Sequence, residues 1–226
     1  MIHYFNFGQG SYPEGTPTFD SKGYLYGTTY EGGLHNGGVA YRLAPPATEG
    51  EAWTYKVLYA FRGTATDGYS PNGGLTLHGR NALYGTSVAG GQYGLGTVFQ
   101  LVPPTVAGGA WTENILYNFA NQNDGVSPVA SVIFDKAGNL YGITWYGGGN
   151  GSGICFNGGC GIVFDLSPPA TEGANWTETV LHSFPASAKD GSSPSGGVIF
   201  GKNGVLFGVT ELGGAGGQGA VFGLIP

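Results

Sequence analysis

The chain has 226 residues, a net charge of −6 and only 10% charged residues, and its eight Lys and Arg are scattered singly. This charge pattern excludes the basic stripe that nucleic acid binding requires, and no apolar run approaches the roughly 20 residues of a membrane helix. The 46 glycines and 13 prolines alone would be typical of a disordered chain, but 4 Trp, 14 Tyr and 13 Phe indicate a packed core.

An internal repeat runs through the whole chain. An aromatic-glycine pair recurs at intervals of 58, 57 and 66 residues, at Tyr26-Gly27, Tyr84-Gly85, Tyr141-Gly142 and Phe207-Gly208. A proline precedes each aromatic by 13 residues, at Pro13, Pro71, Pro128 and Pro194. The residue two positions after each proline is small, as crowded inner strands need: Gly15, Gly73, Ala130 and Gly196. The chain is therefore expected to be one domain of four repeat units, at 8–61, 62–119, 120–184, and 185–226 together with 1–7.

Each unit has the pattern of four short strands. In the second unit these strands are expected at residues 73–78, 82–88, 97–102 and 111–119, with Gly, Pro, Asn and Asp between them. No segment shows an apolar stripe of helical period. Because a period of about 40–60 residues with four strands is typical of propeller blades, the sequence predicts an all-β, four-bladed β-propeller with four antiparallel strands per blade.

The N-terminal residues resemble the end of a fourth strand. Residues 4–7 (Tyr-Phe-Asn-Phe) match residues 58–61, 116–119 and 181–184, while the fourth unit ends after its third strand. We therefore expect residues 1–7 to complete the last blade and close the ring, which would leave no open sheet edge.

The two cysteines, Cys155 and Cys160, lie in an insertion that lengthens the third unit. No cluster of Cys or His nearby would complete a metal site, so no metal site is expected and a small loop disulfide is the better interpretation. A disulfide favours an oxidising, extracellular compartment.

The repeated residues resemble the GloVer tandem-repeat family of bacterial extracellular proteins. The pattern is carried by Gly138-Asn139-Leu140-Tyr141-Gly142, Gly147-Gly148, Val163-Phe164-Asp165-Leu166, Trp176-Thr177 and Asp190-Gly191, and it recurs over the whole chain. The resemblance implies a protein that is secreted or attached to the cell surface. It implies no particular chemistry, because the family looks like a scaffold.

Three aspartates occupy the loops that join one unit to the next, at Asp67, Asp124 and Asp190. Asp at such positions commonly caps a turn by accepting hydrogen bonds from backbone N–H groups. The alternative is that these carboxylates surround a cation near the propeller axis; no other cofactor is expected.

The most variable position among the units is the pair of residues before each Gly pair, where the second strand ends. This pair is Tyr30-Glu31, Val88-Ala89, Trp145-Tyr146 and Glu211-Leu212. Tyr30, Trp145 and Tyr146 offer flat surfaces on which a sugar ring could stack, although such rings also fill gaps between blades. The leading hypothesis is therefore a secreted module that binds carbohydrate or a similar polar polymer. The expected binding face is formed by the loops between units together with the loops between the second and third strands of each unit.

Two further functions remain open. Glu31 and Glu211 belong to units that become neighbours in a closed ring, and a pair of carboxyl groups is what a glycan-active hydrolase or lyase needs as general acid and base. The third hypothesis is a structural surface protein that associates with itself.

Overall fold

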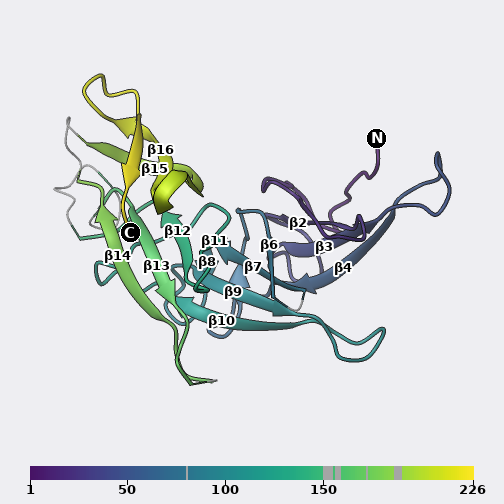
Figure 1. Ribbon diagram of the computed structural model, residues 1–226. Coiled ribbons are helices and arrows are strands. Elements are labelled where there is room, and N and C mark those ends of the chain that lie inside the picture. The colour runs from purple at the N-terminus through teal and green to yellow at the C-terminus, as the bar shows by residue number, and fades with distance from the viewer. Residues whose placement is uncertain (80, 150–154, 156–158, 172, 186–189) are drawn as a thin grey trace.

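The computed structural model describes residues 1–79, 81–149, 155, 159–171, 173–185 and 190–226. The chain is all-β, with four antiparallel sheets arranged as a four-bladed β-propeller (Figure 1). Within the described residues, the one helical element is a 3-10 turn, η2 (Lys202–Gly204). The predicted fold class is confirmed.

The blades follow one another along the chain, each as an antiparallel meander. Blade one contains β1 (Thr18–Phe19), β2 (Leu25–Thr29), β3 (Val39–Ala44) and β4 (Thr54–Ala60). Blade two contains β6 (Thr76–His78), β7 (Ala82–Ser87), β9 (Thr97–Val102) and β10 (Thr112–Asn118). Blade three contains β11 (Ile133–Phe134), β12 (Leu140–Thr144), β13 (Ile162–Ser167) and β14 (Thr177–Ser183). Blade four has three strands, β15 (Gly191–Phe200), β16 (Leu206–Gly213) and β17 (Ala220–Leu224). A separate short ladder joins β5 (Gly68–Tyr69) to β8 (Ala89–Gly90).

Three apolar cores lie between successive blades, and one aromatic contact recurs in all of them. The phenylalanine that follows the outer strand of a blade packs on the third-strand phenylalanine of the next blade, with ring centroids 5.0–5.4 Å apart in the pairs Phe61–Phe99, Phe119–Phe164 and Phe184–Phe222. The first ring of each pair is almost completely buried. Such burial supplies much of the free energy that holds neighbouring blades together.

The glycine of the repeated aromatic-glycine pair makes room for this contact. A Cβ atom on Gly85 would lie 2.7 Å from the ring of Phe99, and one on Gly142 would lie 2.5 Å from the ring of Phe164. Glycine therefore recurs at this position because any side chain would collide with the ring behind it.

The predicted closing strand is not formed. Residues 1–7 adopt no strand, and β17 pairs with β16 alone. The N-terminal segment instead packs on blade one, where the ring of Phe5 lies 5.0 Å from that of Tyr41 and the ring of His3 stacks on Tyr55 at 4.3 Å. Figure 1 shows the N-terminus beside the first sheet, away from β16.

A short connection explains why the expected register fails. The carbonyl oxygen of Phe7 accepts a hydrogen bond from Gly33 N at 2.9 Å. In the next unit, the carbonyl oxygen of Asp67 accepts the corresponding hydrogen bond from Gly91 N. In the second unit, Phe61 at the end of the outer strand precedes the loop residue Asp67 by six residues. In the first unit, Phe7 itself occupies the loop position that corresponds to Asp67. Phe7 consequently cannot also lie at the end of an outer strand, and Phe5 takes over the ring contact with blade one.

Blade four keeps an uncovered apolar surface as a result. Its exposed side chains have relative exposures between 40% and 79%, and they include Phe207, Val209 and Val221. Among the described residues, no apolar cluster joins blade four to blade one.

We predict that Phe5→Ala lowers the free energy of unfolding by about 1–2 kcal/mol, because it removes a half-buried ring from the cluster around Tyr41. Phe7→Ala is the matched control: Phe7 is 59% exposed, so its loss should change stability by less than about 0.5 kcal/mol. Chemical denaturation of both variants measures the difference. A larger effect for Phe7→Ala would favour the strand register expected from the repeat.

Candidate functional site

The four residues that follow the repeat prolines come together at the centre of the propeller. They line one pocket of about 250 Å³ with Trp145, Gly196 and Glu211, and the four are Glu14, Asn72, Val129 and Ser195. The strands pass so close together beneath them that a Cβ atom on Gly15 would lie 2.3 Å from the backbone of Gly74. A Cβ atom on Gly73 would be similarly close to the backbone of Ala130, so close backbone contact requires glycine at these two inner positions, whereas at Gly196 the positive φ of 72° favours it.

The chemistry of this axial pocket is acidic and polar. It holds the carboxyl groups of Glu14 and Glu211, and the described residues that line it include no Lys, Arg or His. Asn72 Nδ2 donates a hydrogen bond to Glu14 Oε2, so these two residues from different blades form one polar wall. Carboxylate and amide groups of this kind suit the hydroxyl groups of a polar ligand.

The structure brings together two of the residues singled out from the sequence. Trp145 and Glu211 both line the axial pocket, and the ring of Tyr146 stacks on that of Trp145 with centroids 5.4 Å apart and planes 6° from parallel. Tyr30 and Glu31 lie in a backbone ladder with Tyr12 and Ser11, and neither lines this pocket.

The carboxyl group that shares the pocket with Glu211 is therefore Glu14, not Glu31. Sequence reasoning missed Glu14 because it compared only the ends of the second strands. The available signal was its position directly after Pro13, which the repeat places beside Asn72, Val129 and Ser195.

The three loop aspartates are engaged in local contacts. Asp67 accepts hydrogen bonds from Tyr59 Oη at 2.8 Å and Arg62 N at 3.2 Å. Asp124 accepts from Ala120 N and Gln122 N, both at 2.8 Å, and from Tyr117 Oη at 3.0 Å. Asp190 Oδ2 lies 3.0 Å from His182 Nε2, and its Oδ1 accepts from Gly191 N.

These contacts are those of a turn cap. In the described part of the chain, no three His, Cys, Asp or Glu side chains lie close enough together to hold a metal ion. The cation alternative has no such cluster to support it there.

Comparison with known families identifies the repeat. Residues 1–158 match the Gloeobacter/Verrucomicrobia repeat. The chain belongs to this family. A search of curated proteins finds no match. The expected family resemblance is confirmed, and the internal repetition extends the same pattern into the fourth unit.

One further feature of this repeat protein, its disulfide, bears on where it can work. Cys155 and Cys160 form a disulfide, as expected from the sequence, whereas residues 150–154 and 156–158 of the insertion lie outside the described residues. None of the described helices is long and apolar enough to span a membrane. The disulfide is compatible with an extracellular protein.

The repeat also builds carboxyl pairs that sequence reasoning missed. Both carboxyl oxygens of Glu113 lie within hydrogen-bond distance of Gly68 N, at 3.2 and 3.4 Å. Burial and the neighbouring Asp67 raise the pKa of Glu113 to about 9. Glu178 occupies the same repeat position in blade three, where burial, Asp124 and Asp165 raise its pKa to about 7. Only the three-dimensional proximity of these acids to the loop aspartates reveals them.

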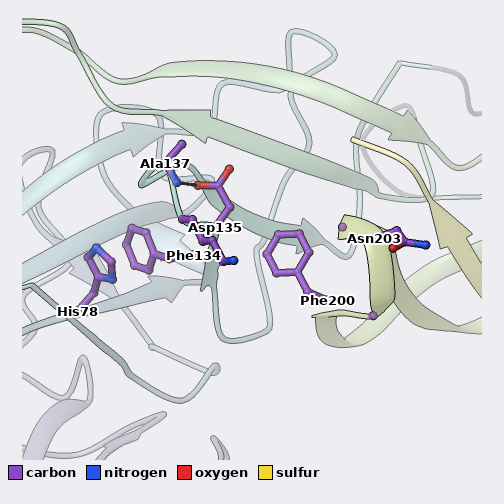
Figure 2. A pocket seen from close by; sticks show the side chains of 9 residues that line it. His78, Phe134, Asp135, Ala137, Phe200 and Asn203 are labelled. Carbon is purple, nitrogen blue, oxygen red and sulfur yellow. Dashed lines mark hydrogen bonds between the residues drawn. The ribbon is translucent and has the colours of Figure 1, made fainter.

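A second cavity, of about 820 Å³, lies at the turns between the first and second strands of blades two, three and four (Figure 2). Its aromatic walls are His78, Phe134 and Phe200. Phe134 and Phe200 share one repeat position at the end of the innermost strand, where blade two has Leu77, and His78 directly follows Leu77. Because the innermost strands run from the axial pocket to these turns, the two cavities open on opposite faces of the propeller. Sequence reasoning missed this position, which is filled by Phe19, Leu77, Phe134 and Phe200 when the units are aligned.

We predict that Glu113→Gln flattens the dependence of stability on pH. The pKa of Glu113 in the folded protein lies above its ordinary value of 4.5, so its stabilising contribution is present in acid and is lost as the pH rises toward 9. The wild type should therefore lose stability relative to Glu113→Gln between about pH 5 and pH 9, by a few kcal/mol.

Denaturation of both proteins across this pH range measures the difference. Glu178→Gln is the matched control, because the pKa of Glu178 is about 7 and its contribution should be lost at lower pH. Parallel curves for the wild type and Glu113→Gln would contradict the assignment of a protonated Glu113.

Proposed function

We propose that this protein is a binding module that holds a carbohydrate, or a similar polar polymer, in the axial pocket. The observation that carries the proposal is the placement of Trp145 beside Glu14, Asn72 and Glu211 in one pocket. An indole ring offers a flat apolar surface for a sugar ring, while carboxylate and amide groups bind the hydroxyl groups at its edge.

Internal repetition supports this choice of residues. Trp145 and Glu211 occupy one repeat position, filled by Tyr30 in blade one and Val88 in blade two. The position after each proline is likewise filled by four different residues. Positions that the shared blade architecture requires are the same in every unit, so two variable sets that meet in one pocket are free to serve a ligand.

The pocket size fits one unit of a longer ligand. At about 250 Å³ it is smaller than the roughly 300–1,000 Å³ typical of pockets for drug-sized molecules. We therefore expect one sugar ring to enter, with the remainder of the polymer on the surface of the face. The disulfide between Cys155 and Cys160 supports a secreted or surface location, where such polymers occur.

We predict that Trp145→Ala weakens glycan binding by roughly 1–3 kcal/mol, the usual effect of removing an aromatic anchor. A glycan array identifies the ligand, and calorimetry on the purified protein gives the affinity. Val88→Ala changes the same repeat position in another blade and should leave affinity unchanged. Equal affinities for the wild type and Trp145→Ala would sink the proposal.

One observation favours an enzyme as the second candidate. Glu14 and Glu211 line the same pocket, and a glycan-active hydrolase or lyase needs two carboxyl groups as general acid and base. Glu14→Gln and Glu211→Gln would then abolish product release while the glycan stays bound, and Glu31→Gln would remain active. Mass spectrometry of a polysaccharide digest tests this, and intact polysaccharide after incubation with the wild type would exclude it.

The exposed apolar residues of blade four favour the third candidate, self-association. Light scattering over a range of protein concentrations, without any glycan, measures such assembly. A monomer at every concentration would exclude it.

A further inference from the structure

We propose that the cavity on the face opposite the axial pocket binds an aromatic carboxylate. The flat ring of the ligand would enter the space between Phe134 and Phe200 (Figure 2). Its acid group would lie toward Lys136, which also lines the cavity. This ligand chemistry differs from that of the acidic axial pocket, and the site does not depend on the proposed glycan binding.

Both aromatic walls are held in place from behind. His78 stacks on Phe134 with centroids 4.0 Å apart and planes 12° from parallel, and the ring of Tyr84 meets Phe134 edge-on at 4.8 Å. Phe200 is supported in the same way by Tyr141, at 5.2 Å and 82°. Rings fixed in this manner lose little side-chain freedom when a ligand enters, which favours binding.

The space between these rings is open and mainly apolar. Figure 2 shows Phe134 and Phe200 on either side of the cavity, with Asp135 and Ala137 along one edge. Its volume of about 820 Å³ falls within the roughly 300–1,000 Å³ of small-molecule sites, which bind mainly through aromatic walls and a few polar groups. A flat apolar ring therefore suits this cavity better than a sugar, whose hydroxyl groups would meet few partners there.

Two oppositely charged side chains, Asp135 and Lys136, line the cavity, and the acid is engaged within its own turn. The carboxylate of Asp135 already accepts hydrogen bonds from Ala137 N, Tyr141 Oη and both the backbone and side-chain nitrogens of Asn139. Burial opposes its ionisation, but these hydrogen bonds outweigh that effect and hold the pKa of Asp135 below its usual value. Lys136 is exposed, and it forms no ion pair with any residue that the structure describes. An anionic group on the ligand would complement Lys136.

Blade one provides an internal comparison. Its turn is built in the same way, since Phe19 pairs with Leu25 as Phe134 pairs with Leu140. Asp20 accepts hydrogen bonds from Lys22 N, Tyr24 N and Tyr26 Oη, much as Asp135 does in its own turn. Phe19, however, is 58% exposed and does not line the cavity. The aspartate therefore stabilises the turn in both blades. Blade three differs because aromatic residues of two neighbouring blades flank Phe134.

Calorimetric titration of the full chain with 2-naphthoate, and with the neutral alcohol 2-naphthylmethanol, tests the proposal. We expect the wild type to bind naphthoate at least fivefold more tightly than the alcohol, with an advantage that shrinks as salt is added. Lys136→Gln should remove this advantage and leave the affinity for the alcohol unchanged. Because Lys136 is exposed, this variant should fold normally.

Variants of the ring positions complete the test. Phe134→Ala should weaken naphthoate binding at least tenfold, whereas Phe19→Ala and Lys22→Gln should bind as the wild type does. Trp145→Ala should also retain full naphthoate affinity, which separates this site from the axial pocket. The proposal is overturned if the wild type binds no naphthoate at millimolar concentration, if it binds acid and alcohol equally, or if Phe19→Ala weakens binding as much as Phe134→Ala.

Discussion

The contact between two phenylalanine rings of neighbouring blades is the interaction on which the rest of this propeller depends. Phe61, Phe119 and Phe184 each pack on the corresponding ring of the following blade. The contact links segments that lie some 40 residues apart in sequence, and it requires a glycine behind the receiving ring. A repeated requirement of this kind explains why the same residues recur at nearly constant spacing along the chain.

Where that contact is imperfect, the propeller is incomplete. Blade one receives Phe5 from the N-terminal segment, whose carbonyl groups are already used in the first loop. At the other interfaces, the packed ring directly follows a strand that pairs within the preceding blade. Phe5 packs on blade one, but its segment does not pair with β17 of blade four. The N-terminal segment covers blade one, and the edge of β17 and its apolar side chains remain exposed.

The residues at both ends of the innermost strands differ among the blades. At one end, the residues after the prolines form an acidic pocket with Trp145 and Glu211. At the other end, His78, Phe134 and Phe200 from three blades line a wider cavity together with Asp135 and Lys136. Two cavities of different chemistry therefore lie at opposite ends of the same strands.

The sequence by itself determined the fold class, the four units and the disulfide between Cys155 and Cys160. These features depend on periodicity and on short-range spacing, which a single chain displays directly. It also indicated Trp145 and Glu211, since positions that vary among otherwise similar units stand out.

Only the tertiary structure decided the partner of Glu211 and the place of the N-terminal segment. Glu14 meets Glu211 because strands from different blades converge at the axis. Phe5 takes the ring contact with blade one because the backbone of Phe7 already lies in the first loop. The burial that raises the pKa of Glu113 likewise comes from side chains distant in sequence. Such features depend on distances between units, which spacing along the chain does not specify.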